Sequence, residues 1–147
     1  MTKFAISIVA LSIIAAAGCG SKEGGASTSA KVDTVEQVAE KSPEEKGGVY
    51  FRQRCAVCHS VTAPGAPGHV ATVGPTLFGV YGAHTAHEEG FGYSPAMRAA
   101  DFTWNDETLD AWIKNPQLVV AGNRMAFAGE PNAEKRADLI AYLKTLK

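Results

Sequence analysis

The sequence has few cysteines and little excess charge. Its 147 residues include three cysteines, and 14 Lys and Arg stand against 15 Asp and Glu, for a formal charge of -1 at pH 7. So balanced a charge argues against nucleic-acid binding, which needs a strongly basic domain. The sequence has no second Cys-x-x-Cys pair and no paired Cys and His at zinc spacing, which argues against a structural zinc site. The length fits one domain with extensions.

Long apolar runs are also scarce, and the one that exists lies at the N-terminus. Lys3 is followed by an apolar stretch from Phe4 to Gly18, which is too short and too early for an ordinary membrane span. A positive residue ahead of a short apolar run is typical of an export signal. We therefore expect residues 1–18 to be a signal peptide.

The end of this run, Ala16-Ala17-Gly18-Cys19, resembles a bacterial lipobox, although leucine is usual where Ala16 stands. Lipidation would also leave no unpaired thiol in an oxidising compartment. Residues 19–41 are rich in Gly, Ser, Ala, Lys and Glu and contain no aromatic residue, as expected of a flexible tether. We expect lipidated Cys19 to anchor residues 42–147 on the periplasmic side of a bacterial membrane. The alternative is cleavage near Ala17 and a soluble periplasmic protein.

The motif Cys55-Ala56-Val57-Cys58-His59 carries the strongest chemical signal of the chain. Two thiols separated by two residues can each add to one vinyl group of a haem, and the adjacent histidine can bind its iron. Cys-x-x-Cys also occurs in dithiol redox pairs and zinc sites, which remain alternatives. No βαβ pattern of the thioredoxin kind surrounds the motif. The favoured interpretation is one haem c, covalently bound through Cys55 and Cys58.

Three helices are predicted around this motif. Ser42, Pro43 and Glu45 form a capping-box pattern for a helix that runs into Cys55. Thr103, followed by Asp106 and Glu107, predicts a second capped helix ending before Asn115-Pro116. Asn132 can cap a third, from Ala133 to about Leu146. The apolar faces of the first and third helices consist of Gly47 and Phe51, and of Leu139, Tyr142, Leu143 and Leu146.

Several residues can complete a haem site. A ligating histidine needs an acceptor for its other ring nitrogen, and we expect the Pro75 carbonyl to serve His59, which then binds iron through Nε2. Buried Tyr and Trp need partners for their polar tips, so Tyr93 and Trp104 are candidate donors to the haem propionates. Trp112 is expected to face the cofactor.

The second axial ligand is expected to be Met125. It lies in the segment from Asn115 to Phe127, which shows no helical period and has Gly122 shortly before the methionine. Such a loop can wrap the far face of a haem. Met97, among small and charged residues, is interpreted as a packing or surface residue. Three histidines remain as rivals for the sixth position: His69, His84 and His87.

From Ser42 to Lys147 the chain resembles the class I cytochromes c of the mitochondrial and bacterial short-loop type. Besides the haem motif, the shared features are Gly47, Phe51, Gly74-Pro75-Thr76-Leu77, Gly90-Phe91-Gly92-Tyr93, Trp104, Asn115-Pro116 with Gly122 through Gly129, and Asp138 through Lys144. The resemblance implies an all-α fold around one haem c. It also implies His59/Met125 ligation and terminal helices that cross at Gly47/Phe51 and Leu139/Tyr142.

The resemblance is not complete. The segment between His59 and Pro75 is longer than in the mitochondrial proteins. Trp112 stands where the family usually has tyrosine, and Asn123 where it has threonine. Asn123 and Phe127 flank Met125, and both are expected haem contacts.

With both axial positions filled, the iron has no open site for a substrate. The predicted function is therefore one-electron transfer in a respiratory or photosynthetic chain, not enzymatic catalysis. A rival is a haem peroxidase or small-gas sensor in which Met125 leaves the iron, although no distal acid/base pair is evident beside Met125. Expected partners are redox proteins, namely a membrane oxidase, a quinol-oxidising complex or a dehydrogenase. We expect a monomer.

Overall fold

The computed structural model describes residues 40–147, and these contain five helices. The predicted signal peptide, Cys19 and the tether up to residue 39 lie outside the described residues. In the part of the chain that the structure describes, extended pairing is limited to an isolated bridge between His84 and Thr103. None of its helices is long and apolar enough to cross a membrane. The predicted all-α fold is confirmed.

The first helix, α1 (Pro43–Arg54), begins as the capping pattern predicts. Ser42 Oγ accepts a hydrogen bond from the backbone N–H of Glu45 at 3.3 Å. In return, Glu45 Oε2 accepts from the Ser42 N–H at 2.9 Å. This reciprocal cap satisfies two backbone donors that a helix terminus otherwise leaves free. It sets where α1 starts, and therefore where Cys55 falls at its end.

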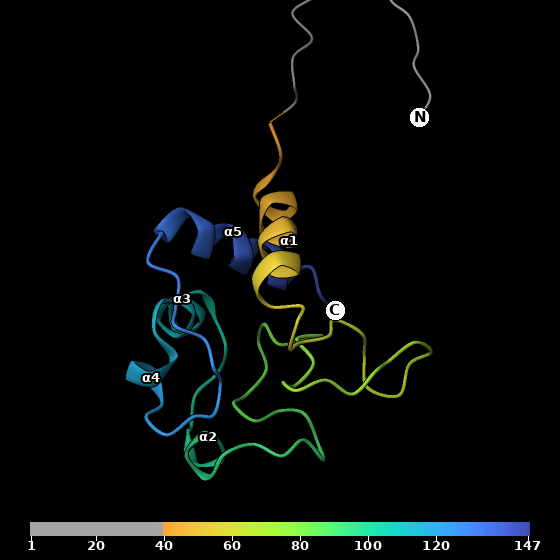
Figure 1. Ribbon diagram of the computed structural model, residues 1–147, viewed down its shortest axis with the longest axis vertical. Coiled ribbons are helices and arrows are strands. Elements are labelled where there is room, and N and C mark those ends of the chain that lie inside the picture. Colours follow the sequence, from red (N-terminus) through yellow and green to blue (C-terminus); the bar gives the residue numbers. More distant parts are fainter. Residues whose placement is uncertain (1–39) are drawn as a thin grey trace, which may run out of the picture. The chain divides into compact units, whose positions relative to one another are not determined.

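The last helix, α5 (Ala133–Lys144), is capped by Asn132 as predicted and packs across α1. Figure 1 shows α1 and α5, from opposite ends of the described chain, side by side. The Phe51 and Tyr142 rings lie 5.4 Å apart between their centroids. The helix ends two residues before the predicted Leu146, because Thr145 caps it and donates its hydroxyl to the Tyr142 carbonyl at 2.7 Å.

The contact between these two helices depends on Gly47. A Cβ atom built on Gly47 would lie 1.9 Å from the Asp138 carbonyl oxygen and 2.8 Å from Tyr142 Cβ. The backbones of α1 and α5 therefore approach more closely than any side chain at this position permits. The predicted crossing of the terminal helices is confirmed.

The middle helix, α3 (Asp106–Lys114), starts from a different cap than predicted. Asn105, not Thr103, is its N-cap: Asn105 Oδ1 accepts from the Thr108 N–H at 2.9 Å, and Thr108 Oγ1 accepts from the Asn105 N–H at 2.9 Å. Thr103 instead pairs with His84, and its carbonyl accepts from the Thr108 hydroxyl at 2.8 Å. The predicted end before Asn115-Pro116 is confirmed.

Two short helices were not predicted. In α2 (Pro95–Ala99), Ser94 is the cap and proline occupies the first turn. In α4 (Pro116–Val119), Asn115 plays the same part, so one turn of the expected irregular loop before Met125 is helical. Both have the Ser-Pro or Asn-Pro start that favours a first helical turn. Neither is long enough to show a hydrophobic period.

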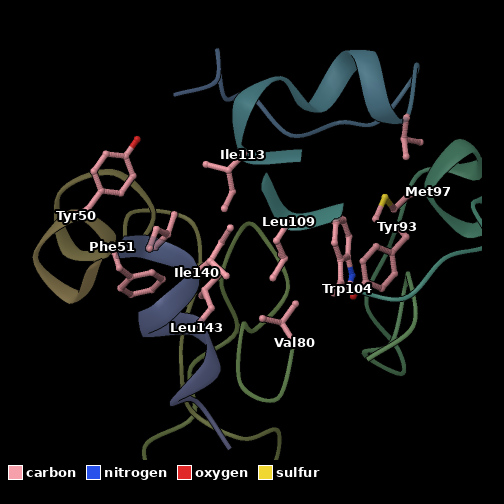
Figure 2. Close-up of a cluster of buried hydrophobic side chains, with 12 residues drawn as sticks. Tyr50, Phe51, Val80, Tyr93, Met97, Trp104, Leu109, Ile113, Ile140 and Leu143 are labelled. Atoms are coloured by element: carbon pink, nitrogen blue, oxygen red, sulfur yellow. The ribbon is translucent and has the colours of Figure 1, made fainter. Parts of the chain in front are cut away.

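The buried core extends from the α1–α5 contact to a group of aromatic residues. Figure 2 shows Phe51, Ile140 and Leu143 at one end, Leu109 and Val80 in the middle, and Trp104, Tyr93 and Met97 at the other end. Met97 is 8% exposed, in agreement with a packing role. The candidate haem residues Tyr93 and Trp104 thus belong to the same buried core as residues of α1, α3 and α5.

Polar contacts join three helices at the edge of this core. The Tyr50 hydroxyl of α1 donates to Glu130 Oε2 at 2.9 Å. The Glu130 N–H donates to the Ile113 carbonyl of α3 at 2.9 Å. Arg136 of α5, only 6% exposed, donates to Asp110 Oδ1 of α3 at 2.7 Å and to the Glu130 carbonyl at 3.1 Å. Because buried charges are costly unless they are paired, these contacts fix the positions of α1, α3 and α5.

Candidate haem site

The two motif cysteines lie on one turn at the end of α1. Cys55 caps the helix, and its N–H donates to the Phe51 carbonyl at 2.8 Å. The N–H of His59 then donates to the Cys55 carbonyl at 2.9 Å. Both thiols are free and half-buried. Burial raises the pKa of the unmodified Cys55 thiol to about 11.

His59 has the hydrogen bond predicted for it. Its Nδ1 donates to the Pro75 carbonyl oxygen at 2.7 Å. Burial lowers the pKa of His59, and the Pro75 hydrogen bond and the charge of Glu88 oppose that effect only in part. The ring is therefore neutral at pH 7 with its proton on Nδ1, which leaves the lone pair on Nε2. This is the tautomer that binds a metal through Nε2.

The segment beneath His59 is held close to the motif. The Gly74 N–H donates to the Cys58 carbonyl at 2.7 Å. A Cβ on Gly74 would lie 2.5 to 2.9 Å from three atoms of the His59 ring, so glycine is needed for the backbone to pass there. Thr76, 3% exposed, donates its hydroxyl to the Thr62 carbonyl at 3.0 Å. The long segment after His59 is thereby tied back to the segment that carries Pro75.

The three predicted aromatic contacts lie in or beside the buried core. Tyr93 and Trp104 are 9% and 5% exposed, and Trp112 is half-buried. The rings of Trp104 and Trp112 pack edge to face, with centroids 5.3 Å apart. The Tyr93 oxygen accepts from the Glu88 N–H at 3.3 Å, so its own proton is free to be donated. The propionate-donor roles of Tyr93 and Trp104 stay predictions.

The Met125 loop is held by Asn123. The Asn123 Nδ2 group donates to the carbonyls of Pro116 at 3.0 Å and Val120 at 2.9 Å, and its Oδ1 accepts from the Met125 N–H at 3.0 Å. Its amide therefore serves the loop, and its predicted contact with haem is untested. Met125 and Phe127 are both half-buried; their roles as ligand and as haem contact also stay predictions.

The rival histidines differ in how far their ring nitrogens are engaged. His84 contacts Asp101 Oδ1 through Nε2 at 2.8 Å and the Thr85 carbonyl through Nδ1 at 3.1 Å. His69 uses Nδ1 toward the Thr62 carbonyl at 3.3 Å. His87 has a buried Nε2 without a hydrogen-bond partner among residues 40–147. Both nitrogens of His84 are thus occupied, which is unfavourable for iron binding.

Glu88 is a residue that sequence reasoning missed. Its carboxylate accepts a hydrogen bond from the backbone N–H of Thr76 at 2.6 Å, and its own N–H donates to Tyr93. It therefore joins the segment that holds His59 to a candidate propionate donor. In the sequence, Glu88 is one of two adjacent glutamates before a glycine, a pattern typical of any exposed turn, so no signal distinguished it.

These groups fit a covalently attached haem. Two free thiols lie on one turn, and the neighbouring imidazole has its Nδ1 engaged and its Nε2 available. Zinc fits less well, because none of the residues described here form a group of three or more His, Cys, Asp or Glu side chains placed to hold a metal ion. The donor set is that of a c-type haem.

Comparison with known proteins agrees with this chemistry. A family model described as Cytochrome c matches residues 44–147. A cytochrome c of Gibberella zeae is 41% identical over 100 residues, which cover 68% of this chain and 91% of the relative. A cytochrome c2 of Rhodomicrobium vannielii is 42% identical over 100 residues, 68% of this chain and 76% of the relative.

A longer match is found in Bradyrhizobium diazoefficiens. Its protein, named as a cytochrome c homolog, is 39% identical over 126 residues, which cover 85% of this chain and 65% of the relative. The all-α fold, the Cys-x-x-Cys-His motif and these relatives agree with one another. The chain therefore belongs to the cytochrome c family of electron-carrying haem proteins and carries one haem c, bound covalently through Cys55 and Cys58.

Proposed function

We propose that this protein is a one-electron carrier, not an enzyme, in which His59 and Met125 are the axial ligands of the haem iron. The observation that carries the proposal is the hydrogen bond from His59 Nδ1 to the Pro75 carbonyl, which leaves Nε2 available beside the two cysteines. When bound, haem c supplies reversible exchange between Fe(III) and Fe(II), and His/Met ligation favours the reduced state.

The residues of the chain have separate tasks in this proposal. The Pro75 carbonyl fixes the tautomer of His59, and Gly74 leaves room for its ring. Asn123 accepts a hydrogen bond from the backbone N–H of Met125. This bond fixes the loop conformation from which the Met125 thioether would bind the iron. Two protein ligands leave no coordination position for a substrate. Electrons then pass through the haem edge to and from redox protein partners.

Replacing Met125 by alanine is expected to abolish the methionine-to-iron charge-transfer band of the oxidised protein. Alanine has no sulfur, so the sixth position is lost or is taken by another group. The measurement is the absorption spectrum of the purified oxidised protein. Met97→Leu is the matched control, because it removes the other methionine of the described residues while keeping a large apolar side chain in the core; its band should remain.

Two results would contradict the assignment. A charge-transfer band that persists in Met125→Ala would show that Met125 is not the ligand. A wild-type protein that readily forms five-coordinate iron and turns over peroxide would favour the enzymatic alternative over the carrier.

We further propose that the protein is exported and tethered to a membrane through Cys19. The support is the sequence Ala16-Ala17-Gly18-Cys19 after a short apolar run. Lipidated cysteines with more than one acyl chain bind membranes firmly. In a bacterial host, Cys19→Ser is expected to move the haem protein from the membrane fraction to the soluble fraction, as followed by haem staining. An unchanged distribution would contradict lipid anchoring.

A further inference from the structure

We propose that Glu88 tunes the reduction potential by polarising the peptide group that holds His59, a role that rests on the proposed axial ligation by His59. Glu88 does not touch the histidine. It acts through the Pro75–Thr76 peptide as a positioning and charge-supplying residue.

The connection consists of two short hydrogen bonds on one peptide unit. His59 Nδ1 donates to the Pro75 carbonyl oxygen at 2.7 Å. The nitrogen of that same peptide belongs to Thr76, and its N–H donates to Glu88 Oε2 at 2.6 Å. The imidazole, the peptide and the carboxylate therefore form one continuous chain of hydrogen bonds.

A peptide group transmits such an effect because its C=O and N–H are conjugated. When the N–H donates to a carboxylate, electron density increases on the carbonyl oxygen, which becomes a stronger acceptor. A stronger acceptor draws the Nδ1 proton away from the His59 ring and makes Nε2 a better electron donor. Stronger donation by an axial ligand stabilises Fe(III) relative to Fe(II), so Glu88 should lower the reduction potential.

The low exposure of these groups to water allows the charge of Glu88 to act on the Pro75–Thr76 peptide without strong screening by solvent. Thr76 is 3% exposed and Glu88 is half-buried, and charge effects are stronger away from water. The Glu88 backbone is fixed by its hydrogen bond to the Tyr93 hydroxyl at 3.3 Å. The Thr76 side chain is held by the carbonyls of Ser60 and Thr62. The carboxylate and its peptide partner are both held in place.

The test compares Glu88→Gln with Glu89→Gln in the purified holoprotein. Glutamine at 88 keeps an acceptor for the Thr76 N–H but removes the charge. We expect the equilibrium constant for reduction to rise about threefold, equivalent to about 28 mV at about 59 mV per tenfold change for one electron. Glu89 is the exposed neighbour, and its replacement removes the same charge without breaking the chain. It should change the constant far less.

A second measurement distinguishes polarisation of the Pro75–Thr76 peptide by Glu88 from a purely structural role of Glu88 in holding that segment. In Glu88→Gln, the NMR signal of the His59 Nδ1 proton should move upfield, since the bond to Pro75 becomes weaker. Glu88→Asp keeps the charge and should restore part of the wild-type potential. Equal potentials in the wild type and Glu88→Gln, or equal shifts in the Asp and Gln variants, would overturn the inference.

These outcomes are distinct from failure of the proposed ligation. If the wild type lacks the methionine-to-iron band, the proposed carrier site is wrong. If Glu88→Gln keeps that band and its potential does not change, only the role of Glu88 is wrong.

Discussion

Replacing Gly47 by alanine is expected to destabilise the folded protein by about 3 kcal/mol or more, at the upper end of the cost of overpacking. A Cβ at this position would lie 1.9 Å from the Asp138 carbonyl oxygen. That atom belongs to the backbone of α5, which cannot rotate away as a side chain can. The helices would have to separate, and the packing of Phe51 on Tyr142 would be lost with them. Denaturant unfolding followed by helix content measures the change.

Gly48→Ala is the control for this prediction. Its Cβ would lie 3.3 Å from two ring atoms of Tyr142 and 3.5 Å from the guanidinium of Arg52. Both are parts of side chains, which can shift by the small distance required. Both variants introduce the same methyl group and the same gain in helix propensity. If Gly47→Ala were as stable as Gly48→Ala, the close approach of α1 and α5 would be wrong.

The second large effect is expected from Gly74→Ala. The added methyl would lie 2.5 to 2.9 Å from three atoms of the His59 ring, so the imidazole must move or the segment must withdraw. Such strain typically costs about 1–3 kcal/mol, and about 1.4 kcal/mol corresponds to a tenfold change in an equilibrium constant. We expect a marked fall in the fraction of low-spin, histidine-ligated iron, measured from the absorption spectrum.

Gly92→Ala serves as its control, because a Cβ there has no neighbour within 4 Å among residues 40–147. Both variants add one methyl to a loop glycine, and only one of them meets the proposed ligand. A Gly74→Ala protein with the wild-type spectrum would indicate that His59 tolerates a displaced Pro75 segment, and the steric argument would fail.

Some features of the fold and site were predictable from the sequence, because the residues concerned have a well-defined structural or chemical role. Ser42 with Glu45 predicted the start of α1. The crossing of the terminal helices at Gly47/Phe51 and Leu139/Tyr142 was implied by the resemblance to class I cytochromes c. The Pro75 carbonyl was predicted as the partner of His59 because a ligating imidazole requires an acceptor, and the hydrogen bond is present. The cap depends on short-range geometry, and the Pro75 hydrogen bond on a requirement of the ligating imidazole.

Other features depend on contacts that sequence spacing does not encode. Thr103 and Asn105 are both good caps, and only the pairing of Thr103 with His84 decides between them. Helix α4 has only four residues, so its sequence is too short to show a helical hydrophobic period. Glu88 reaches Thr76 across 12 positions in the chain, and a carboxylate in a polar turn looks the same whether it accepts that bond or faces water.

The pairing of α1 with α5 also has a consequence for how the protein is made. A ribosome releases α1 and the haem motif first and α5 last, and closing a loop of about 80 residues costs about 4 kcal/mol of chain entropy beyond a constant. The contact that completes the fold around Gly47 therefore cannot form until synthesis is almost finished. The proposed export also starts from the N-terminus, so Cys55 and Cys58 emerge before α5 and belong to an incompletely folded chain until α5 follows; haem can reach both thiols during that interval.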